Sequence, residues 1–305
     1  MPDSTKIIIG SRGSKLALCQ AEWVKTRLMA AGHQVEIKII KTSGDKLVDV
    51  PLPQSGVKGL FIKEIEEALI AGVVHLAVHS LKDLPNDQPD ELYVAAVPRR
   101  EDARDVLISR DLKVFAQLPP ASRVGTSSLR RRSQAAHLRP DLEIVPVRGN
   151  IDTRFSKLDR GDYDALIIAA AGAHRLGLQA RIIQYFSIEQ ICPAVGQGAL
   201  AIEIRKGDTR IELAVAPLDH PATHQAIRAE RATLRRLGGG CQLPIAAYAL
   251  QEDDCLRLQG VVASLDGARL IRAAATGPAD NPENLGAVVA DSLVKQGAHD
   301  ILKSV

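Results

Sequence analysis

The sequence predicts an α/β protein built from two similar lobes and followed by a small α+β domain. Short apolar strands alternate with helices of amphipathic spacing through most of the chain. A similar strand-to-helix corner, glycine followed by small hydroxyl residues, occurs at 10–14 and again at 125–128, which suggests two similar lobes. The last region differs, because residues 245–275 are typical of three strands, the last two joined by an Asp266-Gly267 hairpin turn.

Length and charge limit the possibilities further. The chain has 305 residues, more than one core usually holds, and its hydrophobic fraction of 46% can fill two or three domains. Its 39 Lys and Arg nearly balance 36 Asp and Glu, so the net charge of +3 argues against a global electrostatic role. Aromatic residues make up only 3% of the chain, which leaves little for stacking on nucleic-acid bases.

The cysteines and the N-terminus indicate a reducing compartment. No CxxC spacing occurs, so neither a zinc site nor a disulfide framework is expected of Cys19, Cys192, Cys241 and Cys255. His75 and His79 lack metal-ligand partners at useful spacing and are expected to form core hydrogen bonds. The apolar run at 7–9 is too short for a signal peptide, and no stretch approaches a membrane span. We therefore expect a cytoplasmic protein without a metal or a membrane contact.

The elements of the first lobe follow from apolar spacing and capping residues. The segment 41–58 mixes polar residues with glycines and prolines, which predicts a long mobile loop, often a lid. The other elements are expected in the order strand 7–9, helix from the cap Ser14 to Gly32, strand 35–39, helix 60–71, and strand 76–78 leading into 79–85.

The second lobe is expected between two chain crossings, at 98–105 and 193–198. Its elements are expected in the order strand 123–125, helix from the caps 126–128 through His137, strand 143–147, helix ending near Gly161, and strand 164–169. A strand at 199–204 and a helix at 222–237 follow the second crossing, and a helix at 282–296 ends the chain.

Polar and charged residues gather where the predicted strands end, which is where open α/β sheets bind ligands. Between Arg123 and Arg181, ten Arg and one Lys stand against six acidic residues, which favours a site for carboxylate or phosphate groups. Two such edges facing each other would form an arginine-lined cleft with one prominent acid. The residues after the strand ends are Arg12, 42–45, Ser80, Lys82 and Asp83 in the first lobe, and 126–131, 148–154 and Arg175 in the second.

These residues also have simpler structural interpretations. An arginine near a helix N-terminus opposes the helix dipole unless an anion is present, which favours a site at Arg130 and Arg131. Arg132 is instead expected on a solvated face. Asp83, taken alone, is better explained as the cap of a turn ahead of Pro85.

A single thiol follows three glycines in the stretch Leu237-Gly238-Gly239-Gly240-Cys241. The glycines leave room around the backbone for a thiol that carries something bulky. Taken alone, the stretch is better explained as the glycine stop of a helix followed by a small buried cysteine. A functional role must therefore be supported by the rest of the chain.

Several ordered stretches match one family. They are Gly10-Ser11-Arg12 with Leu16-Ala17-Leu18, Lys58-Gly59-Leu60-Phe61, 77–83, 124–131, 147–150, 193–198 and Gly239-Gly240-Cys241-Gln242. Through them the chain resembles the porphobilinogen deaminase (hydroxymethylbilane synthase) family along nearly its whole length. Gly238 replaces an expected larger side chain and Phe155 an expected aliphatic one, and both departures concern loop shape or packing rather than chemistry.

The resemblance implies an α/β fold with two lobes like those of periplasmic binding proteins, each with a mixed sheet, and a small C-terminal α+β domain. The first lobe is implied to be discontinuous, comprising 1–98 and 199–217, with the second at 104–193. The C-terminal domain, 221–305, is implied to present Cys241 to the cleft. Hinge adjustment is expected near 98–105 and 193–198 as the product grows.

The resemblance also implies a transferase of tetrapyrrole (haem) biosynthesis. Four porphobilinogen units are added, with loss of ammonia, to a dipyrromethane cofactor held by Cys241 through a thioether. Water then releases the linear tetrapyrrole hydroxymethylbilane, which passes to uroporphyrinogen-III synthase. Loss of ammonia leaves an azafulvene, and Asp83 is implied to stabilise positive charge at the ring nitrogen and to help the amine leave. A monomer is expected.

The pyrroles carry acetate and propionate groups, so a bank of cationic and polar residues is expected to bind them. The implied binding residues are Arg12, Ser14, Lys58, Ser80, Lys82, Thr126, Ser128, Arg130, Arg131, Arg148, Gly149, Arg154, Arg175 and Gln197. Two alternatives stay open: a non-catalytic anion-binding receptor or regulator lobe, and a nucleic-acid binder built on 130–132. The first does not require Cys241 together with Asp83, and the second lacks aromatic residues.

Overall fold

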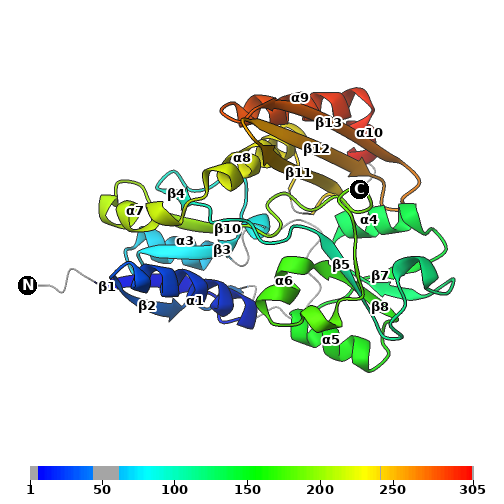
Figure 1. The fold of residues 1–305 in the computed structure, drawn as a ribbon, viewed down its shortest axis with the longest axis horizontal. Coiled ribbons are helices and arrows are strands. Elements are labelled where there is room, and N and C mark those ends of the chain that lie inside the picture. Colours follow the sequence, from blue (N-terminus) through cyan, green and yellow to red (C-terminus); the bar gives the residue numbers. More distant parts are fainter. Residues whose placement is uncertain (1–5, 44–61, 241, 304–305) are drawn as a thin grey trace, which may run out of the picture. The chain divides into compact units, whose positions relative to one another are not determined.

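A computed structural model describes residues 6–43, 62–240 and 242–303 (Figure 1). Most of the expected lid, 44–58, lies outside these residues. Contacts divide the chain into two compact units, 1–100 with 199–224 and 101–198 with 225–305. None of the helices in the described ranges is long and apolar enough to cross a membrane.

The first unit is built around a mixed five-stranded sheet. Its strands are β1 (Lys6–Ser11), β2 (Gln34–Ile39), β3 (Leu76–Ser80), β4 (Leu92–Ala96) and β10 (Leu200–Arg205). They lie in the order β2-β1-β3-β10-β4, with β1, β2 and β3 parallel and β10 antiparallel to both of its neighbours. Strand β10 therefore joins β3 to β4, although residues 101–198 separate it from them in the chain.

Helices cover both faces of this sheet. Ile7 and Ile9 of β1 pack with α1 (Lys15–Ala30) and α7 (Thr209–Val215), whereas Ile8 packs with α3 (Lys63–Ile70). Alternate residues of one strand thus serve opposite cores, as expected of parallel strands that are buried on both sides.

A second mixed sheet repeats this layout. Its strands are β5 (Asp105–Ser109), β6 (Arg123–Gly125), β7 (Glu143–Val145), β8 (Ala165–Ala169) and β9 (Gln184–Tyr185), in the order β7-β6-β8-β5-β9. Here β6, β7 and β8 are parallel, and β5 is antiparallel to β8 and β9. Three parallel strands followed by one reversed strand occur in both sheets, so the predicted pair of similar mixed-sheet lobes is confirmed.

The helices of the second sheet again separate two cores. Ala135 of α4 (Leu129–Leu138) packs on one face with Leu107 and Val124, while Phe155 of α5 (Ile151–Asp159) and Ala173 of α6 (Ala170–Arg175) pack on the other. Phe155 is buried, so its departure from the expected aliphatic residue is a matter of packing.

The third sheet is antiparallel, as predicted, and contains β11 (Ile245–Glu252), β12 (Cys255–Ala263) and β13 (Leu270–Pro278). One face packs against α8 (Pro221–Arg236), α9 (Pro282–Lys295) and α10 (Ala298–Lys303). The other face packs Ala246 and Val261 against Cys192. The α/β fold with a small C-terminal α+β region is therefore confirmed, whereas the expected domain boundaries stay a prediction.

Six helices and strands were not predicted: β4, β5, α6, β9, α7 and α10. The most consequential is β5, because Asp105, expected at the end of a crossing segment, is instead the first residue of a fully buried strand.

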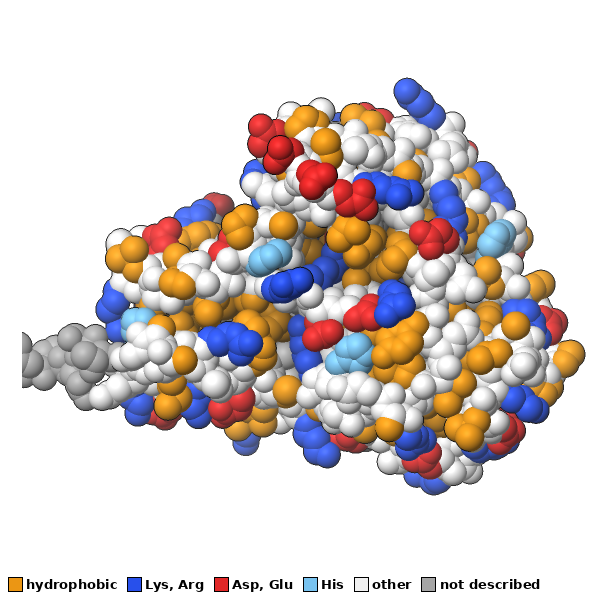
Figure 2. All heavy atoms as spheres, in the orientation of Figure 1, with side chains coloured by type: hydrophobic (Ala, Val, Ile, Leu, Met, Phe, Trp, Pro, Cys, Tyr) orange, Lys and Arg blue, Asp and Glu red, His pale blue; other side chains and the backbone are white. Residues whose placement is uncertain are grey.

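On the face shown in Figure 2, basic and acidic side chains are interspersed, in keeping with the net charge of +3.

The two crossing segments meet at Gly198. Its carbonyl oxygen accepts hydrogen bonds from the Glu101 N–H at 3.2 Å and from Arg175 Nη2 at 2.8 Å. Its φ is +87°, and a Cβ atom built there would lie 2.4 Å from the carbonyl oxygen of Glu101. Glycine is needed here for its conformation and for the close approach of two backbones.

We expect Gly198→Ala to lower the free energy of unfolding more than Gly207→Ala. Both positions have positive φ, so each alanine costs about 1–2 kcal/mol in backbone strain. Only at Gly198 does the added methyl also meet backbone atoms, since no described atom lies within 4 Å at Gly207. Urea unfolding should show a further loss of about 1–3 kcal/mol for Gly198→Ala. Equal losses would contradict the close approach.

Candidate functional site

The carboxyl edge of the first sheet carries the predicted polar residues at two strand ends. Arg12 and Ser14 follow β1, and the Ser14 hydroxyl caps α1 by accepting from the Ala17 N–H at 3.3 Å. Ser80 ends β3, where its hydroxyl accepts a hydrogen bond from Gln20 Nε2 at 2.8 Å. Gln20 was not predicted, although a buried polar residue on the inner face of α1 signals such a contact.

Asp83 lies in a short 3₁₀ turn, Leu81–Asp83, directly after β3. The buried side chains of Leu81 and Leu84 hold this turn, and the Leu81 N–H donates to the carbonyl oxygen of Ala199 at 3.0 Å. The turn leaves Lys82 half-buried and Asp83 exposed. Within the described residues no hydrogen bond to the Asp83 carboxylate is formed, so it does not cap the turn.

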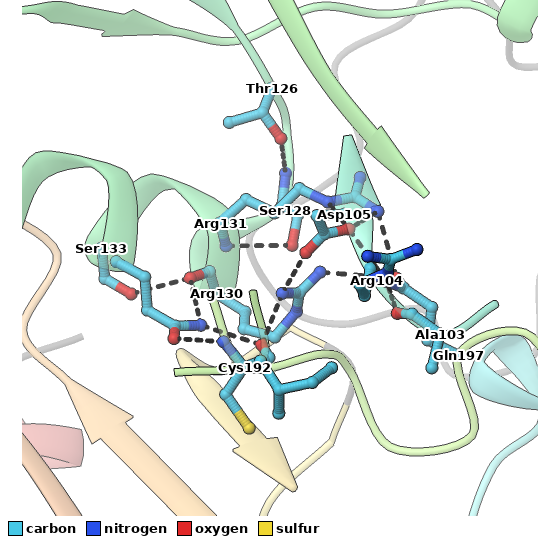
Figure 3. A network of polar contacts seen from close by, with 12 residues as sticks. Ala103, Arg104, Asp105, Thr126, Ser128, Arg130, Arg131, Ser133, Cys192 and Gln197 are labelled. Atoms are coloured by element: carbon cyan, nitrogen blue, oxygen red, sulfur yellow. Dashed lines mark hydrogen bonds and ion pairs between the residues drawn. The ribbon is translucent and has the colours of Figure 1, made fainter. Parts of the chain in front are cut away.

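The carboxyl edge of the second sheet begins with the corner after β6. Ser128 caps α4 by accepting from the Arg131 N–H at 3.4 Å, and the hydroxyl of Thr126 accepts from the Ser128 N–H at 3.3 Å. The predicted cap is confirmed. The corner directs the first turn of α4, with Arg130 and Arg131, toward the start of β5 (Figure 3).

Both arginines are buried and bind one carboxylate (Figure 3). Asp105 Oδ2 accepts from Arg130 Nη1 at 2.6 Å, and Asp105 Oδ1 accepts from Arg131 Nε at 2.9 Å. Burial alone would raise the pKa of Asp105, but the charges of Arg130 and Arg131 outweigh it and lower the pKa to about 2. Arginines near a helix N-terminus led us to expect an anion beside them. The Asp105 carboxylate supplies part of that negative charge.

Gln197 completes this buried group. Its Nε2 donates to Asp105 Oδ1 at 2.9 Å and to the carbonyl oxygen of Ala103 at 2.7 Å, while its Oε1 accepts from Arg131 Nη2 at 3.1 Å. Two guanidinium groups and one carboxylate leave one positive charge in excess. The Nε atom of Arg130 is also buried without a partner among the described residues.

The other predicted arginines follow the ends of β7 and β8. Arg148 is exposed, and Arg154 Nε donates to the carbonyl oxygen of Gly149 at 2.8 Å. Gly149 has a φ of +100°, and a Cβ atom there would lie 2.6 Å from the Thr153 side chain. Arg175 ends α6 and donates to Gly198. The strand ends therefore gather the second-lobe residues at one sheet edge, as predicted.

Lys58 and Cys241 lie outside the described residues. The helix before Cys241 ends as predicted, since α8 stops at Arg236 and Gly238 has a φ of +67°. The two predicted core histidines form the expected bonds: His75 Nδ1 accepts from the Ile8 N–H at 2.9 Å, and His79 contacts Glu203. No group of three or more His, Cys, Asp or Glu in the described part of the chain is arranged to hold a metal ion.

Family models match most of the chain. Residues 7–213 match "Porphobilinogen deaminase, dipyromethane cofactor binding domain", and residues 224–295 match "Porphobilinogen deaminase, C-terminal domain". The chain belongs to the porphobilinogen deaminase family. The porphobilinogen deaminase of Pelobacter propionicus is 50% identical over 299 residues, which cover 97% of this chain and 96% of that protein. That of Carboxydothermus hydrogenoformans is 47% identical over 302 residues, covering 98% and 97%.

Solved structures of similar fold include the methionine-binding protein MetQ, with a TM-score of 0.45 and 14% identity over 70% of this chain and 89% of that chain. A periplasmic substrate-binding protein from Coxiella burnetii has a TM-score of 0.43 and 16% identity, covering 70% and 91%.

Membership of the porphobilinogen deaminase family makes the chain a transferase that uses porphobilinogen in tetrapyrrole synthesis and carries a dipyrromethane cofactor. The residues present fit such a group. A dipyrromethane bears several carboxylates, and the second sheet edge offers one uncompensated buried positive charge, together with Arg148, Arg154 and Arg175. The buried Nε of Arg130 is a donor that an anionic group can satisfy.

We expect Asp105→Asn to destabilise the protein by about 3–5 kcal/mol at pH 7, because it leaves two buried guanidinium groups without their carboxylate. Asp162→Asn, at an exposed pair with Arg160, should change stability by less than about 1 kcal/mol. Urea unfolding of both variants measures the difference.

The ion pairs of Asp105 with Arg130 and Arg131 should make the free energy of unfolding fall at low pH. The pKa of Asp105 is lowered in the folded state, so its contribution is complete above the ordinary value of 3.8 and is lost as pH falls toward about 2. Wild-type and Asp105→Asn stabilities should therefore converge over this range. A constant difference down to pH 2 would contradict the ion pair.

Proposed function

We propose that this chain condenses four porphobilinogen molecules into hydroxymethylbilane, with release of ammonia, on a dipyrromethane held by a thioether at Cys241. The observation that carries the proposal is the excess of buried positive charge at the Arg130–Arg131–Asp105 group, in a chain with porphobilinogen deaminase matches along most of its length. Membership of an enzyme family favours this function over a non-catalytic receptor.

The arginine edge of the second unit would hold carboxylates. Each pyrrole unit brings an acetate and a propionate, and without cations the growing chain would suffer strong charge repulsion. Arg131 and Arg130 are pre-oriented by Asp105, so they lose little freedom when an anion binds. Exposed Arg148 and half-buried Arg154 and Arg175 would bind carboxylates that arrive later.

The edge of the first unit would supply the chemistry. Asp83 is exposed on a turn held by buried leucines, so its carboxylate is presented without being tied to the turn. There it would stabilise positive charge at the pyrrole nitrogen of porphobilinogen and, when protonated, assist departure of the amine. Arg12, Ser14, Ser80 and Lys82 would bind substrate carboxylates beside it.

The dipyrromethane, when bound, supplies the pyrrole carbon to which the first unit is joined. Cys241 is the proposed anchor because it follows three glycines and belongs to the stretch Gly239-Gly240-Cys241-Gln242. Ser128, Thr126, Gly149 and Gln197 would complete the binding edge, and Lys58 would bind a further carboxylate.

Several finer features belong to the same proposal. The chain would act as a cytoplasmic monomer that binds neither a membrane nor nucleic acid, and its product would pass to uroporphyrinogen-III synthase. The proposed domains are 1–98 with 199–217, 104–193, and 221–305, with adjustment near the two crossing segments as the product lengthens.

We expect Asp83→Asn to lower kcat about 100-fold or more while changing KM less than about threefold, because the amide can neither carry the charge nor transfer the proton. Asp90→Asn, an exposed neighbour in the following loop, should retain wild-type kcat. Turnover of porphobilinogen measures both. Wild-type kcat in Asp83→Asn would overturn the catalytic role.

Intact mass tests the anchor and the function together. The purified wild-type chain should exceed its sequence mass by two linked pyrrole units, and the Cys241→Ala variant should not. Cys255→Ala, at an exposed cysteine, should keep the added mass. A bare wild-type mass that persists after incubation with porphobilinogen would contradict the proposal.

A further inference from the structure

A buried polar group lies behind the turn that carries Asp83, and none of the roles proposed above involves it. Glu203 of β10 is fully buried and His79 of β3 nearly so. Glu203 Oε2 lies 3.0 Å from His79 Nε2, and Glu203 Oε1 accepts from Gln88 Nε2 at 2.6 Å. Both oxygens of one buried carboxylate are therefore bound by side chains from either side of the Asp83 turn.

Strand pairing brings these side chains together. In the antiparallel pair, Ala201 lies opposite His79, and Glu203 lies opposite Ala77. His79 and Glu203 are thus diagonal neighbours on one face of the sheet, within reach of long side chains. Burying a carboxylate costs several kcal/mol unless it is paired and hydrogen-bonded. The bonds from Glu203 to His79 and Gln88 are therefore a strong constraint on the positions of both side chains.

The order of these residues along the chain shows which segment the group holds in place. His79 immediately precedes Ser80, and Gln88 follows Asp83 by five residues, so Glu203 ties both ends of the segment 80–87 to β10. The Leu81 N–H adds a third tie, to Ala199, the residue just before the same strand. We infer that Glu203 is a positioning residue that holds the Asp83 turn in place through His79 and Gln88.

A second carboxyl, that of Glu66, responds to the charge of Glu203. Glu66 of α3 faces the pair, and burial, followed by the charge of Glu203, raises the pKa of Glu66 to about 7, against a smaller opposing effect of His79. The carboxyl of Glu66 is therefore largely protonated in mildly acidic solution. It adds no second negative charge beside Glu203 there.

The test is a set of kcat measurements on the full-length, cofactor-loaded protein. This inference rests on the role of Asp83 proposed above. Glu203→Gln, of equal size, and Gln88→Ala should each lower kcat about tenfold or more, because a displacement of about 1 Å can cost up to a hundredfold, while KM changes less than threefold. Glu67→Gln, beside Glu66 but exposed on α3, should leave both constants unchanged.

A double-mutant cycle distinguishes positioning from general damage. In an Asp83→Asn background, Glu203→Gln should lower kcat no further, because the turn then carries no catalytic carboxylate. Gln88→Ala should behave in the same way, and it decides the matter if Glu203→Gln does not fold.

Two results would overturn the inference: wild-type kcat in Gln88→Ala and in any folded Glu203→Gln variant, or losses that multiply in the Asp83→Asn background. Failure of the proposed function is recognised separately, by wild-type kcat in Asp83→Asn itself.

Discussion

The ion pairs of Asp105 with Arg130 and Arg131 govern the second sheet edge. They bury two guanidinium groups in the first turn of a helix, where the dipole disfavours cations. Only a carboxylate at the same edge offsets the cost of this burial. The antiparallel direction of β5 brings one there, because Asp105, the first residue of β5, lies opposite Ala169, the last residue of β8. The edge thus keeps rigid arginines and one spare positive charge.

The first sheet uses its reversed strand in the same way. Strand β10 begins opposite Ser80, the last residue of β3, and its fourth residue, Glu203, places a carboxylate 3.0 Å from His79, close to the Asp83 turn. One layout therefore supplies a buried acid to each edge. In the second sheet Asp105 orients two arginines. In the first sheet Glu203 holds the turn on which Asp83 is exposed.

Sequence reasoning succeeded where a local signal exists. The corners at Ser14 and Ser128, the glycine after α8 and the gathering of polar residues at strand ends follow from capping and strand direction. Asp105 was missed because β5 adjoins a charged, proline-marked segment, although the apolar run after Asp105 and the arginines' need for an anion both pointed to it. The role of Glu203 depends on a pairing between distant strands, which no local pattern encodes.

The position of β10 in the chain has a consequence during synthesis. Strands β3 and β4 leave the ribosome before residues 101–198, yet the strand that joins them comes only afterwards. At about 5–20 residues per second, the first sheet waits roughly 5–20 s with two unpaired strand edges. The second sheet lies wholly within the intervening residues and can form first. The second sheet can therefore be complete on the ribosome before the first, and until β10 is made the edges of β3 and β4 remain open to pairing with other strands.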